Sequence, residues 1–115
     1  MARFVRVKGF TDGIDPVLVP PVRMLIVATL VDQQWHEFAA LRASLRLSPP
    51  VLSKQLTTLR AAGYLDTRPS SDGRRSSWRI TDCGIDQLAM HLASWERLMS
   101  LASSAVRSAR TNNQQ

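Results

Sequence analysis

The sequence predicts one mainly α-helical domain that carries a small β-hairpin, an α+β fold. Three observations support this prediction. Apolar residues recur at helical spacing in several segments, proline and glycine mark the ends of these segments, and residues 64–81 alternate apolar and polar side chains around an Asp-Gly turn. The length of 115 residues suits a single domain with a buried core.

The first part of the chain predicts an arm followed by a helix. Residues 1–14 alternate basic and apolar side chains imperfectly and end in a Thr-Asp-Gly turn, so we expect an N-terminal arm or leader. Asp15 is a plausible helix N-cap, with Pro16 at the first helical position. Because Pro20 and Pro21 interrupt this start, the continuous helix is expected over residues 21–31. Its predicted buried side consists of Val22, Leu25, Ile26, Thr29 and Leu30.

The middle of the chain predicts two helices joined by a short turn. Residues 35–37 suit a very short strand or the start of a helix, and residues 38–46 show apolar side chains at helical spacing. The next helix, over residues 48–62, has the clearest start. Ser48 can cap it, and Pro49 and Pro50 occupy first-turn positions whose amides have no intrahelical acceptor. Gly63 suits the position just beyond its end. The inward residues predicted for the two helices are Phe38, Leu41, Leu45, Leu52, Leu56 and Leu59.

Residues 64–81 predict a hairpin whose charge is unusual. Two strand-like pieces, 64–68 and 76–81, flank a polar tip, and Trp78 and Ile80 share the face that packs. Like charges across a hairpin repel one another, so a cluster of one sign indicates an acidic partner. The clustered residues are Arg68, Arg74, Arg75 and Arg79.

The last predicted helix, over residues 82–106, carries an apolar seam at heptad spacing. Such a seam can dock on its own domain or pair with a second copy of the chain, and the length of the seam favours pairing as a twofold homodimer. Residues 15–106 would then form the domain, and residues 107–115 a flexible tail. The expected interface residues are Val17, Leu18, Val22, Ile85, Leu88, Leu92, Trp95, Met99, Ala102 and Val106.

Composition narrows the class of protein. The net charge of +6 favours contact with polyanions, such as nucleic acid or an anionic membrane surface. The single cysteine, Cys83, excludes an internal disulfide and favours a reducing, cytoplasmic location. No apolar run is long enough to span a membrane. His36, His91 and Cys83 lack the spacing of metal ligands, and no catalytic constellation is evident, so we expect no metal, no cofactor and no enzymatic activity.

Residues 41–81, LRASLRLSPPVLSKQLTTLRAAGYLDTRPSSDGRRSSWRIT, resemble the winged helix-turn-helix of ArsR- and MarR-like bacterial transcriptional regulators. Asp-Pro-Val at residues 15–17, SPPVLSKQLTTLRAAGYL, and GRR followed by WRIT-x-x-G are similar to small stand-alone winged helix DNA-binding regulators of bacteria and archaea. The resemblance covers residues 15–100. It implies a recognition helix at 48–62, a wing at 64–81 and a homodimer formed by the first and last helices. Arg46 stands where these families often have glycine, so a positive φ there would be strained.

The expected function is sequence-specific binding of double-stranded DNA by a dimeric transcriptional regulator, by default a repressor. The outward face of the third helix carries one cation and small hydroxyl groups, which suits the major groove, and the wing arginines suit the phosphate backbone or a narrow minor groove. The expected DNA-contact residues are Ser48, Pro50, Ser53, Lys54, Gln55, Thr57 and Thr58 on the helix, and Arg68, Ser70, Ser71, Arg74, Arg75, Ser76 and Arg79 on the wing.

Two alternatives stay open. The same fold can serve as a protein-interaction module whose basic wing meets an acidic partner. It can also serve as a sensor gated by an unknown small-molecule effector or by an oxidant. In the sensor, Trp35, Trp78 and Trp95 would line an effector pocket, or Cys83 would react near the N-terminus of the last helix.

Overall fold

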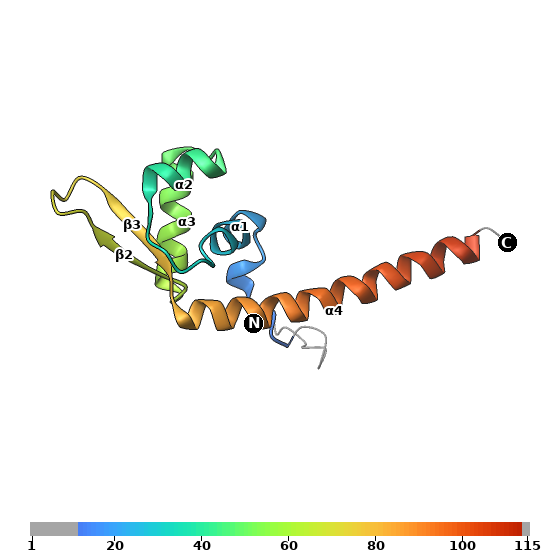
Figure 1. Cartoon of the computed structure of the whole chain (residues 1–115). Coiled ribbons are helices and arrows are strands. Elements are labelled where there is room, and N and C mark those ends of the chain that lie inside the picture. Colours follow the sequence, from blue (N-terminus) through green and yellow to red (C-terminus); the bar gives the residue numbers. More distant parts are fainter. Residues whose placement is uncertain (1–11, 114–115) are drawn as a thin grey trace, which may run out of the picture.

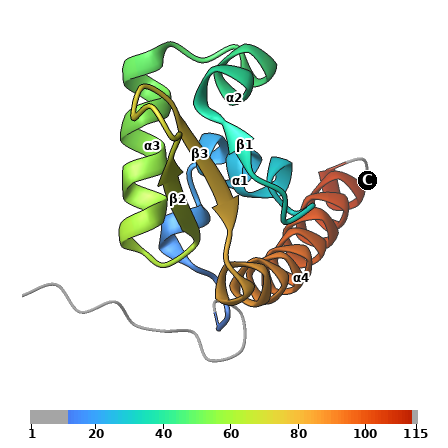
Figure 2. The ribbon, with the colours of Figure 1, turned by 60° about the vertical axis from the view of Figure 1, so that its left-hand side comes forward.

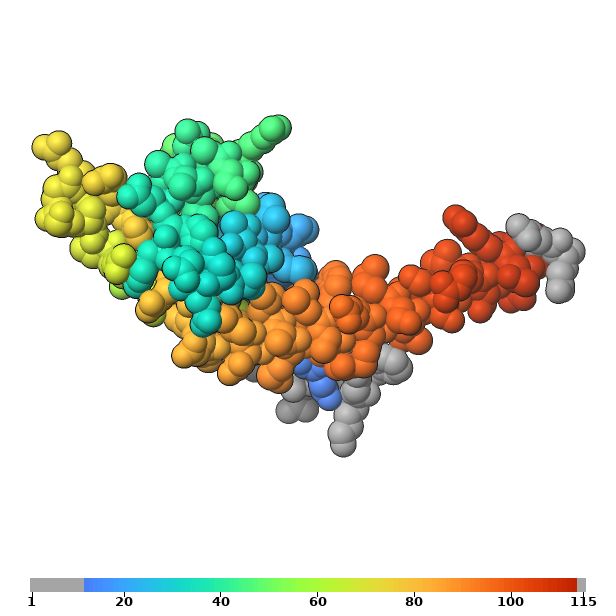
Figure 3. Space-filling model, in the orientation of Figure 1, coloured from blue at the N-terminus to red at the C-terminus, as the bar shows by residue number. Residues whose placement is uncertain are grey.

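The structure, a computed structural model, describes residues 12–113, so most of the expected N-terminal arm lies outside the described residues. Helices form the body of the molecule, the hairpin projects at one end, and the last helix extends past the body at the other (Figures 1 and 3). This arrangement confirms the predicted fold class. The elements are a 3₁₀ turn η1 (Pro16–Leu18), α1 (Pro21–Thr29), β1 (His36–Glu37), α2 (Phe38–Leu45), α3 (Pro49–Ala61), β2 (Leu65–Pro69), β3 (Ser76–Ile80) and α4 (Asp82–Asn113).

The strands form one antiparallel sheet in the order β1-β3-β2, so the short β1 joins the hairpin as a third strand. Leu65 pairs with Ile80 and Thr67 with Trp78 across the hairpin, and His36 pairs with Trp78 on the other side of β3. Side chains alternate between the two faces of a strand, so Leu65, Trp78 and Ile80 share the face that meets the helices. Figure 2 shows this sheet beside α3.

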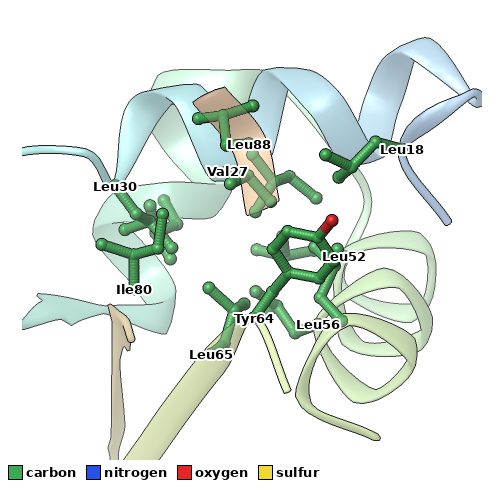
Figure 4. Packing of buried hydrophobic residues seen from close by; sticks show 12 residues of the cluster. Leu18, Val27, Leu30, Leu52, Leu56, Tyr64, Leu65, Ile80 and Leu88 are labelled. Atoms are coloured by element: carbon green, nitrogen blue, oxygen red, sulfur yellow. The ribbon is translucent and has the colours of Figure 1, made fainter. Parts of the chain in front are cut away.

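The core lies between α1, α2, α3, the root of the hairpin and the first turns of α4 (Figure 4). Helix α3 contributes its predicted stripe, because Leu52, Leu56 and Leu59 are all 0% exposed. With the leucines on one side, the opposite side of α3 is left free of packing. The buried apolar residues are Leu18, Ile26, Val27, Leu30, Leu41, Leu52, Leu56, Leu59, Tyr64, Leu65, Ile80 and Leu88.

The predicted inward side of α1 is partly wrong. Leu25 is 52% exposed, whereas Val27 is fully buried beside Ile26. The stretch Leu25-Ile26-Val27 is apolar throughout, so its spacing does not reveal which side faces inward. The neighbouring elements decide, and they turn the helix so that Leu25 meets solvent.

Local capping follows the sequence with one difference. As predicted, Asp15 is an N-cap followed by Pro16: its side chain accepts a hydrogen bond from the Val17 N–H at 3.0 Å and caps the turn η1. Ser48 occupies the N-cap position of α3 without a capping hydrogen bond from its side chain. Because Pro49 and Pro50 have no N–H, the first turn of α3 has fewer donors to satisfy. Arg46 adopts the left-handed conformation, with φ of 55°, that its place in the turn suggested.

Helix α4 begins with a close contact to the start of the hairpin. The Thr81 hydroxyl donates to the Gly63 carbonyl at 2.7 Å and accepts from the Gly84 N–H at 2.8 Å, which caps the helix. Gly84 is buried, and a Cβ placed there would lie 2.6 Å from the Tyr64 carbonyl oxygen. Glycine at this position therefore lets α4 pack directly on the backbone of the domain.

The end of α4 differs from the prediction. The helix continues to Asn113, so residues 107–113 are helical where a flexible tail was expected. Polar composition suggested fraying, but serine, arginine and alanine side chains in residues 103–110 are compatible with a continuous helix. Within residues 12–113 no helix combines the length and the hydrophobicity that crossing a membrane requires.

Candidate nucleic-acid interface

The outward side of α3 is an exposed surface with one positive charge. Pro50, Ser53, Lys54 and Thr57 are all exposed, on the side of the helix away from the leucine stripe. The Lys54 ammonium makes no ion pair with any residue between 12 and 113. Ser48, just before the helix, is also exposed. The surface is thus narrow and cationic, and bulky side chains do not block it.

The threonine hydroxyl groups of α3 are already engaged as donors. The Thr57 hydroxyl donates to the Ser53 carbonyl at 2.9 Å, and the Thr58 hydroxyl donates to the Lys54 carbonyl at 3.1 Å. A hydroxyl has one hydrogen, so each threonine presents a methyl group and acceptor lone pairs to a partner. Thr57 is exposed and Thr58 is half-buried. Methyl contact with thymine is therefore the readout that Thr57 suits.

Gln55 lies apart from the outward surface. It is half-buried, and its Oε1 atom accepts a hydrogen bond from the Arg23 Nε–H at 2.9 Å. Arg23 also donates through Nη1 to the Val17 carbonyl at 3.3 Å. Gln55 follows Leu52 by three positions and precedes Leu59 by four, which places it on the flank of the buried stripe. The structure thus joins Gln55 to α1 and does not bring it together with Lys54.

The wing tip is a tight turn held by its own side chains. The Ser70 hydroxyl donates to the Asp72 carboxylate and accepts from the Arg75 N–H at 3.1 Å. The Arg74 N–H also donates to Asp72, at 3.0 Å, and Gly73 adopts a positive φ of 71°. The Ser70 hydroxyl and then the Arg74 N–H hold the pKa of Asp72 below its usual value. Because its one hydrogen is used here, the Ser70 hydroxyl does not have a hydrogen left for a phosphate.

The four wing arginines have different surroundings. The guanidinium groups of Arg68 and Arg79 lie over the ring of Trp35, at 4.3 and 4.4 Å from its centroid. Arg75 Nη1 lies 3.6 Å from the Glu37 carboxylate, with both side chains largely exposed. The Arg74 side chain makes no hydrogen bond or ion pair to any described residue. Trp35 and Glu37 were missed as wing residues, because they lie far from the hairpin in sequence.

The other two serines predicted as wing contacts, Ser71 and Ser76, have a hydroxyl hydrogen available for a partner. Ser71 is exposed, and the Ser76 hydroxyl accepts from the Trp78 indole N–H at 3.1 Å, which leaves its own hydrogen available. Two further exposed arginines, Arg42 on α2 and Arg46 in the turn before α3, were not among the expected DNA-contact residues. The replacement of glycine by a strained arginine at position 46 was the signal that pointed to that turn.

The residues considered for an effector pocket, a reactive thiol or a metal site do not lie together in the structure. Trp35 lies with the wing arginines, Trp78 packs against the core, and Trp95 stacks on His91 with ring centroids 5.8 Å apart. Cys83 is exposed. Between residues 12 and 113, no three side chains of histidine, cysteine, aspartate or glutamate cluster as metal ligands.

Two of the expected dimer residues belong to the core. Leu18 is 0% exposed and Leu88 is 5% exposed, so both are already covered by their own chain. Val17, Val22 and Ile85 are partly buried against the same core. The seam of α4 therefore divides: its first part packs on the domain, whereas Met99 and Val106 are 47% and 53% exposed. Docking on the chain's own domain, the alternative interpretation of the seam, is correct for the first part.

A compact trihelical body, an exposed cationic helix and a basic hairpin together define a winged helix DNA-binding protein. Residues 22–99 match the family model described as winged helix DNA-binding domain. The chain belongs to this family. A search among curated proteins found no match.

Solved structures of transcriptional regulators share the fold. The transcriptional regulator homologue from Pyrococcus horikoshii OT3 is 26% identical, with a TM-score of 0.68 over 73% of this chain and 85% of that one. The PcaV transcriptional regulator from Streptomyces coelicolor, in complex with its natural ligand, is 17% identical, with a TM-score of 0.65 over 91% and 77%. The transcriptional repressor CouR, bound to a 23-mer DNA duplex, is 20% identical, with a TM-score of 0.63 over 91% and 78%. The chain is thus a DNA-binding protein of the transcriptional-regulator class.

Proposed function

We propose that two copies of this chain bind one DNA duplex, with α3 in the major groove and the wing on the phosphate backbone, and that this binding represses transcription. One observation carries the proposal: the side of α3 that bears Lys54 is exposed, while the leucine side is buried. Lys54, Ser53 and Thr57 would meet the bases or nearby phosphates, and Arg74 would meet the backbone.

The DNA-contact surface that we propose is smaller than the set predicted from sequence. Gln55 is left out because it bonds to Arg23, and Ser70 because it shapes the wing turn. Thr58 is left out because it is half-buried and bonds to the Lys54 carbonyl, and Arg68 and Arg79 because they lie over the Trp35 ring. The surface offers few large donors, so sequence selection would rest partly on DNA shape and on the spacing of half-sites. The residues retained on α3 and the wing tip are Ser48, Pro50, Ser53, Lys54, Thr57, Ser71, Arg74, Arg75 and Ser76.

The proposed homodimer uses the free part of α4. Leu92, Met99 and Val106 follow one another at heptad spacing and are 37%, 47% and 53% exposed, which is unusual for apolar side chains on one face of a long helix. A second copy would cover them together with Trp95 and Ala102, with Val17 and Val22 at the margin. Reading helices paired in this way would lie about 34–36 Å apart, one turn of the double helix.

We also propose that the protein acts in the cytoplasm and that it has no catalytic function. A regulator that acts on DNA in a bacterial or archaeal cell works in the cytoplasm, and one exposed cysteine is compatible with a reducing compartment. In the polar cluster of Asp15, Tyr64 and His91, Tyr64 and His91 are buried and Asp15 is half-buried, and the cluster serves the stability of the domain. We therefore propose binding and not catalysis as the function.

The test compares Arg74→Ala/Arg75→Ala with the wild type on a duplex selected from randomised sequence, at several salt concentrations. The slope of log K against log salt is negative, and each lost phosphate contact reduces its magnitude by about 0.9, so the double variant should show a slope up to about 1.8 shallower. Arg107→Ala/Arg110→Ala removes the same charge from the far end of α4 and serves as the control. Equal slopes for both double variants would contradict the wing assignment.

The same measurement separates DNA binding from the protein-interaction alternative. A module built for an acidic protein partner would bind duplex weakly, with no preference among sequences and with a steep loss at physiological salt. A winged helix regulator should select one sequence over random duplex by about a thousandfold or more. Selection of no sequence by the wild type would favour the interaction module.

A further inference from the structure

The outer face of the sheet carries a side chain that holds the base of the wing. Trp35, immediately before β1, contacts the guanidinium groups of both Arg68 on β2 and Arg79 on β3. One indole ring is thus shared by two cations that belong to different strands of the hairpin. The negative face of an indole attracts a guanidinium group, and it offsets the repulsion between two arginines on one sheet face.

The strand register explains why these residues meet. Glu37 and Arg68 both pair with Ser77, and Asp66 pairs with Arg79. Side chains that pair directly share a face, and residues two apart on a strand do as well. Trp35 therefore falls on the same face as Glu37, Arg68 and Arg79, opposite to the face that packs on the core. This face brings Trp35 and Glu37 against three of the four wing arginines.

We propose that Trp35 is a positioning residue for DNA binding, which fixes the hairpin by holding Arg68 and Arg79 so that Arg74 is presented to the phosphate backbone. The proposal rests on the proposed function. It divides the wing arginines into two pairs: Arg68 and Arg79 brace the base, and Arg74 and Arg75 contact DNA from the tip. Glu37 lies 3.6 Å from Arg75 on the same side of the sheet, is not part of the brace, and competes with phosphate for Arg75.

The hairpin has a physical need for such a brace. A two-stranded ribbon is marginally stable by itself in water, and β1 supports it over two residues only. A mobile wing would have to be ordered during binding, and the free energy of ordering would reduce the affinity. Contacts that exist before DNA arrives remove this cost. Trp35 thus raises affinity without touching DNA.

Measurements of salt dependence distinguish bracing from direct contact. Trp35→Leu keeps an apolar side chain but loses the aromatic face. We expect it to weaken binding by about five- to tenfold at every salt concentration, with an unchanged slope, whereas Trp35→Phe should restore most of the affinity. Arg68→Ala and Arg79→Ala should each weaken binding by about two- to fivefold, again with an unchanged slope. Arg74→Ala should make the negative slope shallower by about 0.9.

The possible results test the positioning role of Trp35 separately from the proposed DNA-binding function. Wild-type affinity in Trp35→Leu would overturn the positioning role, and a reduced slope in both Arg68→Ala and Arg79→Ala would show that these arginines contact phosphates themselves. Additive losses in Trp35→Leu/Arg68→Ala would also contradict the brace, because a shared contact can be lost only once. Hydrogen exchange of residues 65–80 adds a readout without DNA, and it should accelerate in Trp35→Leu but not in Arg74→Ala. Failure of the wild type to bind any duplex would instead contradict the proposed function.

Discussion

The Nδ1 atom of His91 accepts a hydrogen bond from the backbone N–H of Asp15 at 3.0 Å. The Asp15 carboxylate in turn accepts from the Tyr64 hydroxyl and from the Val17 N–H. His91 is fully buried, and its Nε2 atom has no hydrogen-bond partner among the described residues. This network ties the start of the domain to α4. An Nδ1 that accepts requires the neutral imidazole with its hydrogen on Nε2.

Stability should fall in mild acid because of His91. Burial lowers the pKa of His91 below its ordinary value of 6.5, although the Asp15 carboxylate opposes the shift. Below pH 6.5 the unfolded chain takes up a proton that the folded chain resists, so the free energy of unfolding decreases as the pH falls through this range. Urea denaturation at pH 7.5, 6 and 5 measures the effect. His91→Gln should be less stable at pH 7.5 and should lose less between pH 7.5 and 5, and an unchanged pH dependence would exclude His91 as its source.

Glu37 should weaken DNA binding through its contact with Arg75. The two side chains lie 3.6 Å apart and are largely exposed, so their attraction is small and a phosphate can replace it. Glu37→Gln should raise the affinity for duplex DNA by about two- to fivefold at low salt. Glu96→Gln removes the same charge from an exposed position on α4 and is the control. A similar gain in both variants would indicate overall charge and not this contact.

Substitution of Arg23 should mainly reduce stability, whereas substitution of Lys54 should mainly weaken DNA binding. Arg23 joins Gln55 and the Val17 carbonyl, so Arg23→Met should lower the free energy of unfolding by about 1–2 kcal/mol. Lys54 is exposed, so Lys54→Met should change stability by less than about 0.5 kcal/mol and weaken binding more than Arg23→Met does. Urea denaturation and duplex titration on both proteins check this. The reverse order of the two affinities would show that Arg23, and not Lys54, meets the DNA.

A charge on the free seam of α4 should dissociate the proposed dimer. Met99→Glu places a carboxylate among exposed apolar side chains that a second copy would cover, which is costly in a buried interface. Sedimentation at micromolar concentration should show a dimer for the wild type and a monomer for Met99→Glu. Ser104→Glu adds the same charge on another side of α4 and should remain dimeric. A monomeric wild type would contradict this use of the helix.

Gly84 should be intolerant of a side chain. Because an added Cβ would lie 2.6 Å from the Tyr64 carbonyl, Gly84→Ala should lower the free energy of unfolding by about 1–3 kcal/mol, despite the higher helix propensity of alanine. Asp86→Ala, at an exposed position of the same helix, should change stability much less. Thermal denaturation of the two variants is sufficient. A Gly84→Ala variant more stable than the wild type would show that α4 can move away from Tyr64 without cost.

The spacing of apolar and polar residues predicted those features that depend on residues close together in the sequence, such as the buried side and the start of a helix. The spacing of Leu52, Leu56 and Leu59 fixed the buried side of α3, because polar residues separate the leucines, and the proline pair marked the start of the helix. The continuous apolar run around Leu25 offered no such contrast. Patterns also gave no sign of the partners of side chains on distant segments. Arg23 meets Gln55, and Trp35 meets Arg68, only because tertiary packing brings α1 beside α3 and Trp35 beside the hairpin.

Because α4 is long, a small tilt at its N-terminal end produces a large displacement at its C-terminal end. Its 32 residues span about 48 Å, at about 1.5 Å per residue. A tilt of about 10° where the helix leaves the Gly84 contact displaces the other end by about 8 Å, more than two base-pair steps of about 3.4 Å. If two chains pair along the C-terminal halves of their α4 helices, the same tilt would move each α3 helix out of register with its DNA half-site. In such a dimer, the close contact between Gly84 and the Tyr64 backbone would set the distance between the two α3 helices.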